Sequence, residues 1–195
     1  MFINWKLREI NLKIVYYGPA LSGKTTNLEY VHSKLKPELR GELISLKTRE
    51  DRTIFFDFLQ LELGEIKGLK PKFNLYTVPG QVIYAASRKL VLQGADGVVF
   101  VADSQRDRLQ ANVESMHSLE NNLRQLGYDP AHIPFTIQYN KRDLPDRAPI
   151  AVLKARLGRN GVPQIESVAI RGIGVFDTLK TIINVVVIKV QRELG

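Results

Sequence analysis

The sequence predicts an α/β fold: a doubly wound, mostly parallel sheet with helices on both faces. Apolar runs alternate along the chain with segments of helical character. Most of these runs are apolar throughout rather than at every second residue, which is typical of strands that are covered on both faces. A glycine-rich loop stands between the first run and the first helical segment, as in a strand, loop and helix unit.

Five apolar runs are the predicted strands, and helical segments separate them. The predicted strands are Ile10–Tyr17, Phe73–Val78, Gly97–Ala102, Ile133–Tyr139 and Ile165–Ala169, and the helices begin near Lys24, Ala85, Arg108, Ile150 and Val175. Right-handed crossovers would bring the carboxyl ends of the strands to one edge, where doubly wound sheets bind their ligands. We expect one domain over residues 1–195, without repeats or linkers.

The loop after the first predicted strand, residues 18–25, fits the G-x-x-x-x-G-K-[ST] pattern of a phosphate cradle. Its glycines let the backbone curl so that N–H groups and the helix start face negative charge. Lys24 would reach the outer phosphates of a nucleotide, and Thr25 would offer a hydroxyl to Mg²⁺. The nucleotide-binding residues predicted here are Gly18, Ala20, Leu21, Ser22, Gly23, Lys24, Thr25 and Thr26.

A second polar motif, Asn140-Lys141-Arg142-Asp143, follows the predicted strand Ile133–Tyr139. An aspartate there can accept hydrogen bonds from the N1–H and the exocyclic amine of guanine, whereas adenine would leave the carboxylate unpaired. Asp143 is therefore the predicted base reader. Asn140 would brace the loop and the cradle, and the alkyl chain of Lys141 would cover a face of the purine. The two motifs together predict a site for GTP or GDP with Mg²⁺.

The segment from Thr48 to Phe58 mixes charged and aromatic residues beside the expected phosphate site. Such a segment is a candidate for one that orders around the γ-phosphate and is released on hydrolysis. Thr53 would then supply a second hydroxyl to Mg²⁺. The alternative, a surface threonine that opens an aromatic strand, fits the sequence equally well.

Composition and charge limit the cellular context. The chain has no cysteine, which excludes disulfides and thiol-linked lipids, and its first residues lack a signal-peptide layout. We therefore expect a cytoplasmic protein without a direct membrane anchor. The net charge of +8 is scattered and has no accompanying aromatic stacking motif, so we expect no nucleic-acid partner. The basic surface would equally suit an acidic protein or an anionic membrane face.

The order of the motifs resembles that of the Ras-like small GTPases, which belong to the P-loop NTPases, over the whole chain. The motifs are the cradle, Thr53, Thr77-Val-Pro-Gly80-Gln81 and Asn140-Lys-Arg-Asp143. More narrowly, Arg52-Thr53 with Phe55-Phe-Asp-Phe58, Thr77-Val-Pro-Gly-Gln81 and Ala86-Ser-Arg-Lys-Leu90 look like the bacterial MglA group. The resemblance implies a cytoplasmic GTPase switch for cell polarity or gliding motility, which partners could recruit to a cell pole. It also implies a roadblock-domain regulator of the MglB type.

The resemblance further implies catalytic roles. Gly80 would give its N–H group to the γ-phosphate, and Gln81 would orient the attacking water. Arg52 would be an arginine finger that the chain itself supplies. The expected catalytic residues are therefore Gln81 and Arg52.

A further family element, which contacts the guanine O6 through a backbone N–H group, falls at Val168, Ala169 and Ile170. The central alanine of the element is kept, whereas the flanking serine and lysine are replaced. These replacements are expected to weaken the choice of guanine rather than to abolish it.

Two departures from the Ras-like pattern affect the chemistry. Ras-like proteins carry an aspartate that holds Mg²⁺ through water where this chain has Thr77, so the ion would depend on Thr25, Thr53 and the phosphates. Asp57 is a candidate replacement, but the spacing does not fix where it points. Ala20 replaces a cradle glycine. Either the added methyl group crowds the γ-phosphate, which predicts slow hydrolysis, or the loop simply accommodates the alanine.

Three functions therefore compete. The first is a GTP-hydrolysing switch that is slow without a partner. The second is a scaffold that stays loaded with GTP and hydrolyses negligibly, which Ala20 and Thr77 favour. The third is a P-loop kinase for a small molecule, although the sequence shows neither an arginine-rich lid nor an acceptor site. No motif indicates the effector protein.

Overall fold

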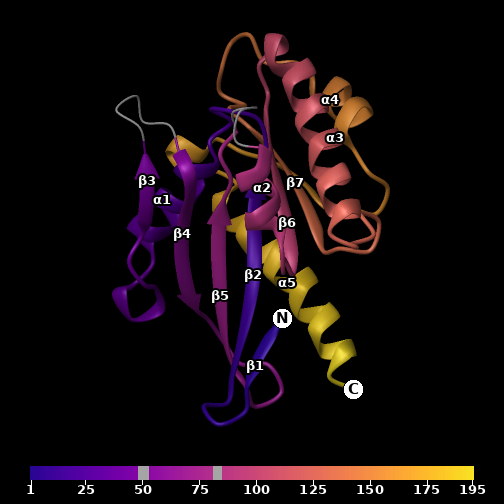
Figure 1. Cartoon of the computed structure of the whole chain (residues 1–195). Helices are drawn as coiled ribbons and strands as arrows, with labels where there is room; N and C mark the ends of the chain where they lie inside the picture. The colour runs from indigo at the N-terminus through magenta and orange to yellow at the C-terminus, as the bar shows by residue number, and fades with distance from the viewer. Residues whose placement is uncertain (48–52, 81–84) are drawn as a thin grey trace.

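Helices cover both faces of one eight-stranded sheet in the computed structural model, which describes residues 1–47, 53–80 and 85–195 (Figure 1). The strands are β1 (Phe2–Asn4), β2 (Glu9–Tyr17), β3 (Ile44–Lys47), β4 (Thr53–Glu62), β5 (Lys70–Thr77), β6 (Gly97–Asp103), β7 (Phe135–Asn140) and β8 (Gln164–Glu166). The α-helices are α1 (Lys24–Lys34), α2 (Ala85–Leu92), α3 (Leu109–Gln125), α4 (Ile150–Leu157) and α5 (Val175–Glu193). Short 3₁₀ turns are η1 (Pro37–Leu39), η3 (Arg106–Arg108) and η4 (Ala169–Arg171). Among the described residues, no helix combines the length and apolar character that a membrane span requires.

The strand order is β3-β4-β5-β2-β6-β7-β8, and β1 pairs with β2 in antiparallel fashion. Strands β5, β2, β6, β7 and β8 run parallel, whereas β4 is antiparallel to both of its neighbours. The register pairs Tyr16 with Thr77 and Asp103 with Asn140. The ends of β2, β5, β6 and β7 therefore meet at one edge, and the loops that carry the polar motifs leave the sheet there.

The predicted fold class is confirmed, and the differences lie at strand ends and at one antiparallel pair. Strand β5 begins at Lys70, ahead of the predicted Phe73, because its residues alternate between buried and less buried positions and its polar residues interrupt the apolar run. The last predicted strand ends at Glu166, because the chain turns into η4 at Ala169. The β3–β4 pair was not predicted as part of the sheet.

Two apolar clusters, one on each face, hold the helices to the sheet. Ile14 and Tyr16 of β2 pack in the cluster with α1 and α5, whereas Val15 and Tyr17 pack in the cluster with α2, α3 and α4. This alternation follows from the two-residue repeat of a strand. Gly97 of β6 lies so close to α5 that a Cβ atom there would be 2.6 Å from the side chain of Val186.

Candidate functional site

The cradle connects β2 to α1, and two of its glycines lie too close to neighbouring chain for any side chain. Gly18 and Gly23 have φ angles of 148° and 96°. A Cβ atom on Gly18 would lie 2.2 Å from the carbonyl oxygen of Val101, and one on Gly23 would lie 2.2 Å from Nδ2 of Asn140. The cradle is therefore packed between β6 and the end of β7, and helix α1 starts directly after it.

Lys24 lies buried inside the cradle, where its Nζ donates hydrogen bonds to the carbonyl oxygens of Pro19, at 2.7 Å, and Gly18, at 3.1 Å. Burial is the main reason that the pKa of Lys24 falls to about 7. The carboxylate of Asp57 raises this pKa, whereas nearby cations lower it. The positive charge of the ammonium group is thus not fully compensated by nearby negative charge. A bound phosphate would compensate it.

The hydroxyl of Ser22 is also buried in the cradle, and it has no hydrogen-bond partner among the described residues. Buried hydroxyl groups without a partner are uncommon, so such a group indicates a place for a ligand or water. Together with Lys24, it makes the inner surface of the cradle suitable for an anion.

The side chain of Asn140 connects the cradle to the segment that follows β8. Its Nδ2 donates to the carbonyl oxygen of Ser22 at 2.8 Å, and its Oδ1 accepts from the backbone N–H of Ala169 at 2.9 Å and from the hydroxyl of Ser167 at 3.1 Å. The side chain is 2% exposed, so water does not compete for these bonds. Three segments far apart in the sequence are therefore fixed to one another by one amide group.

A cavity of about 370 Å³ opens beside Asn140. Its lining combines the predicted base-binding residues with parts of the cradle. The lining residues are Leu21, Gly23, Thr26, Asn140, Lys141, Asp143, Leu144, Val168, Ala169 and Ile170. Ala169 is buried, whereas Ile170 is 79% exposed at the rim. Asp143 forms an ion pair of 3.8 Å with Arg171, a neighbour that the sequence did not indicate.

Asp57 points toward the metal-binding end of the predicted site. It is fully buried, and its Oδ2 accepts hydrogen bonds from the hydroxyls of Thr25, at 2.5 Å, and Thr77, at 2.6 Å. Its Oδ1 accepts from the hydroxyl of Ser45. The backbone N–H of Asp57 in turn donates to Thr77 Oγ1 at 2.9 Å. The spacing of the sequence did not fix where Asp57 points, and the structure shows that its carboxylate lies beside Thr25.

Hard oxygen donors are what Mg²⁺ prefers, so the hydroxyl of Thr25 and the carboxylate of Asp57 fit such an ion. The described residues contain no cluster of three or more His, Cys, Asp or Glu side chains that could hold a metal alone. Phosphate oxygens would therefore have to complete the coordination.

Gly80 packs directly against the cradle. A Cβ atom on Gly80 would lie 2.3 Å from the amide nitrogen of Ala20 and 2.6 Å from the carbonyl carbon of Pro19. A cavity of about 550 Å³ adjoins this contact, and its lining includes Arg88 and Arg108. The predicted γ-phosphate end of the site is thus narrow at Ala20 and bordered by two arginines.

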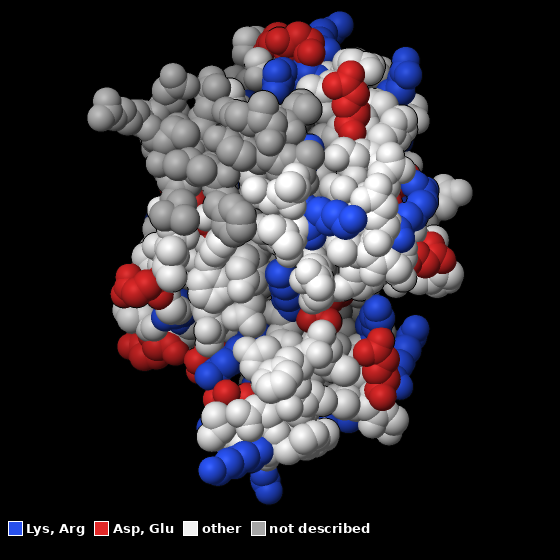
Figure 2. All heavy atoms as spheres, viewed as in Figure 1, with Lys and Arg blue, Asp and Glu red and all other residues white. Residues whose placement is uncertain are grey.

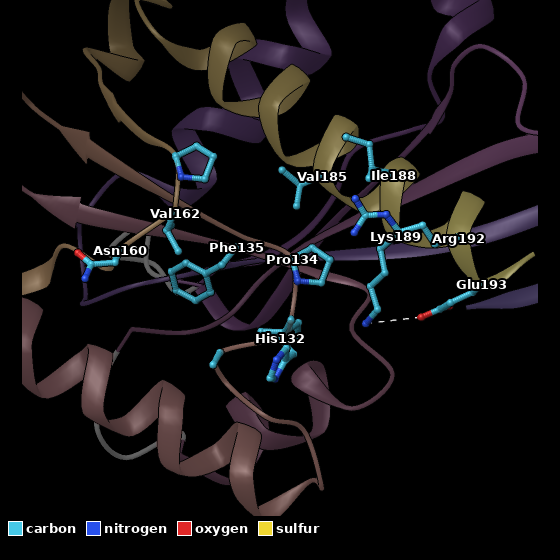
Figure 3. Close-up of a pocket in the computed structure, with 14 residues that line it drawn as sticks. His132, Pro134, Phe135, Asn160, Val162, Val185, Ile188, Lys189, Arg192 and Glu193 are labelled. Atoms are coloured by element: carbon cyan, nitrogen blue, oxygen red, sulfur yellow. Dashed lines mark ion pairs between the residues drawn. The ribbon is translucent and has the colours of Figure 1, made fainter.

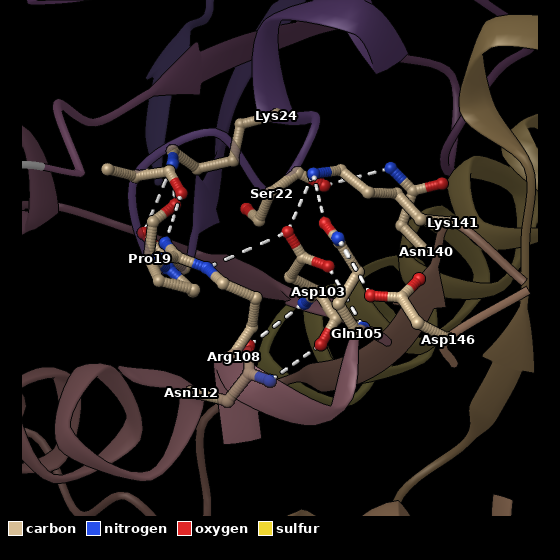
Figure 4. Close-up of polar contacts among 12 residues, drawn as sticks. Pro19, Ser22, Lys24, Asp103, Gln105, Arg108, Asn112, Asn140, Lys141 and Asp146 are labelled. Carbon is tan, nitrogen blue, oxygen red and sulfur yellow. Dashed lines mark hydrogen bonds and ion pairs between the residues drawn. The ribbon is translucent and has the colours of Figure 1, made fainter. Parts of the chain in front are cut away.

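Figure 4 shows a polar network around Asp103 that the sequence analysis missed. The buried Oδ2 of Asp103 accepts a hydrogen bond of 2.6 Å from Lys141 Nζ and lies 4.0 Å from Nε of Arg108. Nη2 of Arg108 donates to the carbonyl oxygen of Ala20 at 3.0 Å. Asn112 exchanges two hydrogen bonds with the backbone of Asp103. One carboxylate therefore connects the base cavity with the cradle. The sequence did contain one indication of this role: Asp103 follows an apolar run, at the edge of the sheet where the other motifs lie.

Three predicted residues are not placed in this site. Thr53 opens β4, but its side chain is not described. Arg52 and Gln81, the two expected catalytic residues, lie outside the described residues.

A cavity of about 480 Å³ lies away from these motifs, where β7 begins and α5 ends (Figure 3). Phe135, Val162, Val185 and Ile188 give it apolar walls, and Lys189 and Glu193 form an ion pair of 3.8 Å at its rim. It contains none of the predicted site residues, so we assign it no part in nucleotide binding.

The chain is similar to a known protein over almost its whole length. The chain is 56% identical over 191 residues to the mutual gliding-motility protein MglA of Myxococcus xanthus (strain DK1622), and the alignment covers 98% of each protein. No protein-family model matches the chain.

Proposed function

The chain belongs to the MglA family of Ras-like small GTPases, and on this premise we propose that it is a GTP-binding and GTP-hydrolysing switch. A single domain over residues 1–195 would regulate cell polarity or gliding motility through partners that bind its GTP form. The observation that carries the proposal is the position of Asn140, which bonds to the cradle at Ser22 and to the backbone of Ala169 beside the base cavity. A nucleotide would span the cradle and the base cavity, and Asn140 fixes these two sites relative to each other.

The base cavity suits guanine. The carboxylate of Asp143 would accept from N1–H and the exocyclic amine, and the backbone N–H groups of Val168, Ala169 or Ile170 would serve O6. Because Lys141 Nζ is held by Asp103, its alkyl chain lies along the cavity and would cover the purine. Lys24 would neutralise the outer phosphates.

Thr25, Asp57 and Thr53 are the residues that would hold Mg²⁺ against the phosphates. Thr25 and Thr53 would offer hydroxyls directly, and Asp57 would act through a water molecule or through Thr25. A bound Mg²⁺ supplies charge neutralisation to the phosphate groups. The burial of Asp57 keeps its carboxylate in place without bulk water.

Hydrolysis would be a direct displacement at the γ-phosphorus. The water oxygen forms a bond to phosphorus while the bond to the bridging oxygen of GDP breaks, and the proton of the water ends on the released phosphate. Gln81 would orient the water, the N–H of Gly80 would bind a γ-oxygen, and Arg52 would stabilise the charge of the transition state. We infer a slow reaction in the isolated chain, accelerated by a roadblock-domain regulator of the MglB type.

The decisive experiment is single-turnover hydrolysis of Mg²⁺-GTP by the purified chain, with and without a roadblock-domain protein from the same genome. Stimulation by that protein is the expected result. Preference for GTP over ATP in a competition assay, and its loss in Asp143→Ala, would test the base assignment separately. Equal competition by ATP would contradict the proposal.

The second candidate function is a GTP-loaded scaffold with negligible hydrolysis, and the Ala20–Gly80 contact favours it. The backbone of Ala20 leaves no free space toward Gly80, and Ala20 also lines the cavity beside this contact, where its methyl group would add volume that a glycine lacks. Measurable exchange of GTP with no turnover, even with the regulator, would support this alternative.

A further inference from the structure

Three apolar side chains are exposed near the N-terminus, one in β1 and two in the turn that joins β1 to β2. Phe2 is 65% exposed, Trp5 71% and Leu7 57%. Turn tips are ordinarily polar, and tryptophan is among the most costly residues to leave in water. We call residues 1–8 the N-terminal tip. Its apolar residues are not needed for the core, because neither apolar cluster of the sheet includes Phe2, Trp5 or Leu7.

The tip is an ordered part of the sheet rather than a frayed end. Strand β1 pairs with β2 from Phe2 to Asn4. The backbone N–H of Leu7 donates to Oδ1 of Asn4 at 3.2 Å, which closes the turn. The terminal ammonium group forms an ion pair of 2.6 Å with Asp96. The backbone therefore holds Trp5 and Leu7 outward.

Four basic side chains lie in the tip or beside it. Lys6, Arg8, Lys67 and Lys70 are all exposed, and none of them has an ion pair within the described part of the chain. The backbone N–H of Lys70 donates to the carbonyl oxygen of Arg8 at 2.7 Å, so the turn before β5 adjoins the tip.

Acidic neighbours only partly offset this positive charge. Glu9 and Glu62 both contact Lys72, at 2.9 Å and 3.8 Å, and Glu65 is exposed in the turn before β5. At the lower end of the molecule in Figure 2, which is viewed as in Figure 1, basic side chains in blue project from a surface of uncharged residues in white.

We propose that the N-terminal tip docks reversibly on an anionic lipid bilayer. Trp5, Leu7 and Phe2 would enter the interfacial layer, where aromatic side chains are favoured, and the four cations would contact lipid phosphates. A bilayer is favoured as the partner because the exposed apolar side chains lie among exposed basic ones, a combination that matches the apolar interior and the anionic headgroups of such a membrane. This contact differs from a lipid anchor or a membrane-spanning helix, and it goes beyond the proposed switch function.

The place of the tip in the sheet suits such docking. Strand β2 begins at the tip and ends at the cradle, so the tip lies at the opposite end of the strand from the nucleotide site. A bilayer at the tip would leave the nucleotide edge free for partners. We therefore expect the docking not to depend on the bound nucleotide, and it can be tested apart from GTP hydrolysis.

Trp5 is the only tryptophan of the chain, so its fluorescence reports on the tip alone. The experiment adds vesicles of phosphatidylcholine, with or without phosphatidylserine, to the full chain and records the tryptophan emission. We expect a blue shift, and quenching by brominated lipid, with phosphatidylserine vesicles only. The shift should weaken with added salt, because salt screens surface charge.

Co-sedimentation with the same vesicles tests the individual residues. Lys6→Gln with Arg8→Gln should weaken partitioning about 30-fold, since each basic residue near an anionic surface contributes about 1 kcal/mol and roughly 1.4 kcal/mol is a factor of ten. Leu7→Ser should weaken it as well. Controls are Lys154→Gln with Arg156→Gln, and Val152→Ser, which remove a lysine, an arginine and an exposed aliphatic side chain from α4. These controls should sediment like the unaltered chain.

Unchanged Trp5 emission with phosphatidylserine vesicles would overturn the proposal. Equal losses in the tip and α4 variants would also overturn it, because overall charge rather than the tip would then drive binding. A shift of Trp5 emission on addition of a purified roadblock-domain protein, with none on vesicles, would assign the tip to a protein partner instead.

Discussion

The carboxylate of Asp57 in β4 accepts a hydrogen bond of 2.6 Å from the hydroxyl of Thr77 at the end of β5. Ras-like proteins carry an aspartate where this chain has Thr77. Here an acidic side chain from the adjacent antiparallel strand lies beside Thr77, which holds it through two hydrogen bonds. The site thus has a negative charge beside Thr25 although residue 77 carries none.

Replacement of Asp57 should therefore uncouple nucleotide retention from Mg²⁺. In Asp57→Asn the amide has a similar shape but no charge, so Mg²⁺ should slow GDP dissociation about 10- to 100-fold less than it does in the unaltered chain, the usual range for residues that support a metal site. The measurement is the GDP dissociation rate with Mg²⁺ and with a chelator.

Glu62→Gln removes an exposed carboxylate from the same strand and is the matched control. It should leave the effect of Mg²⁺ unchanged. If Asp57→Asn retained the full effect of Mg²⁺, the carboxylate would have no part in holding the ion.

The lowered pKa of Lys24 predicts that nucleotide binding takes up a proton. In the free chain Lys24 loses its charge above about pH 7. Bound phosphates favour the ammonium form and raise this pKa, so between about pH 7 and pH 9 the complex holds more protons than the free chain. Affinity for GDP should consequently fall as pH rises above 7, by at most about tenfold per pH unit.

Calorimetry in buffers of different ionisation enthalpy measures that uptake directly. At about pH 6 Lys24 is already charged and uptake from it should vanish. Lys154→Gln, which removes an exposed lysine of α4, should show the uptake of the unaltered chain. A GDP affinity that did not change between pH 7 and pH 9 would contradict a neutral Lys24.

The sequence predicted most of the sheet because its central strands are apolar on both faces. Strand β6 is buried at every residue, which an apolar run detects without ambiguity. Strand β5 was predicted only in part, because it buries every second residue. The β3–β4 pair was not predicted, because antiparallel pairing depends on contacts across the sheet and not on a continuous apolar run.

The cradle and the base motif were predictable because their chemistry fixes residue types at fixed local spacing. Asp57 and Asp103 had no such local pattern. Whether an aspartate in a strand points at a metal site or at solvent depends on the register with the next strand, and the pairing of Phe58 with Tyr76 sets that register here. The contact of Arg108 with the cradle likewise could not be predicted, because it depends on how the start of α3 packs against the cradle.

Arg108 should act as a positioning residue for the cradle. Its hydrogen bond to the carbonyl oxygen of Ala20 fixes the loop that would hold the phosphates. Loss of one such bond from a partly exposed side chain is worth about 1 kcal/mol, so Arg108→Ala should speed GDP dissociation about fivefold. Arg106→Ala removes an exposed arginine two residues earlier in the same 3₁₀ turn and should leave the rate unchanged. Equal rates in both variants would remove Arg108 from this role.

The close approach of α5 to β6 predicts a stability effect at Gly97. A Cβ atom there would lie 2.6 Å from the side chain of Val186 and 3.3 Å from that of Ile182, so Gly97→Ala must displace these side chains or the helix that carries them. Overpacking of this kind costs about 1–3 kcal/mol of the free energy of unfolding, which urea denaturation measures. Gly41→Ala is the control, because its Cβ would lie 3.6 Å from Gln60 at ordinary contact distance. Equal stability of the two variants would show that α5 can shift without cost.

The methyl group of Ala20 predicts the sign of one catalytic effect. Gly80 packs against the backbone of Ala20, and we expect the methyl group of Ala20 to crowd the space in which the attacking water is oriented. A displacement of about 1 Å from the reactive geometry can cost on the order of 10²-fold in rate, so Ala20→Gly should accelerate single-turnover hydrolysis by up to that factor. Affinity for GDP, which lacks the γ-phosphate, should change little and is the internal control. Without acceleration in Ala20→Gly, slow hydrolysis would have to arise elsewhere, and the replacement of the Ras-like aspartate by Thr77 would be the next cause to test.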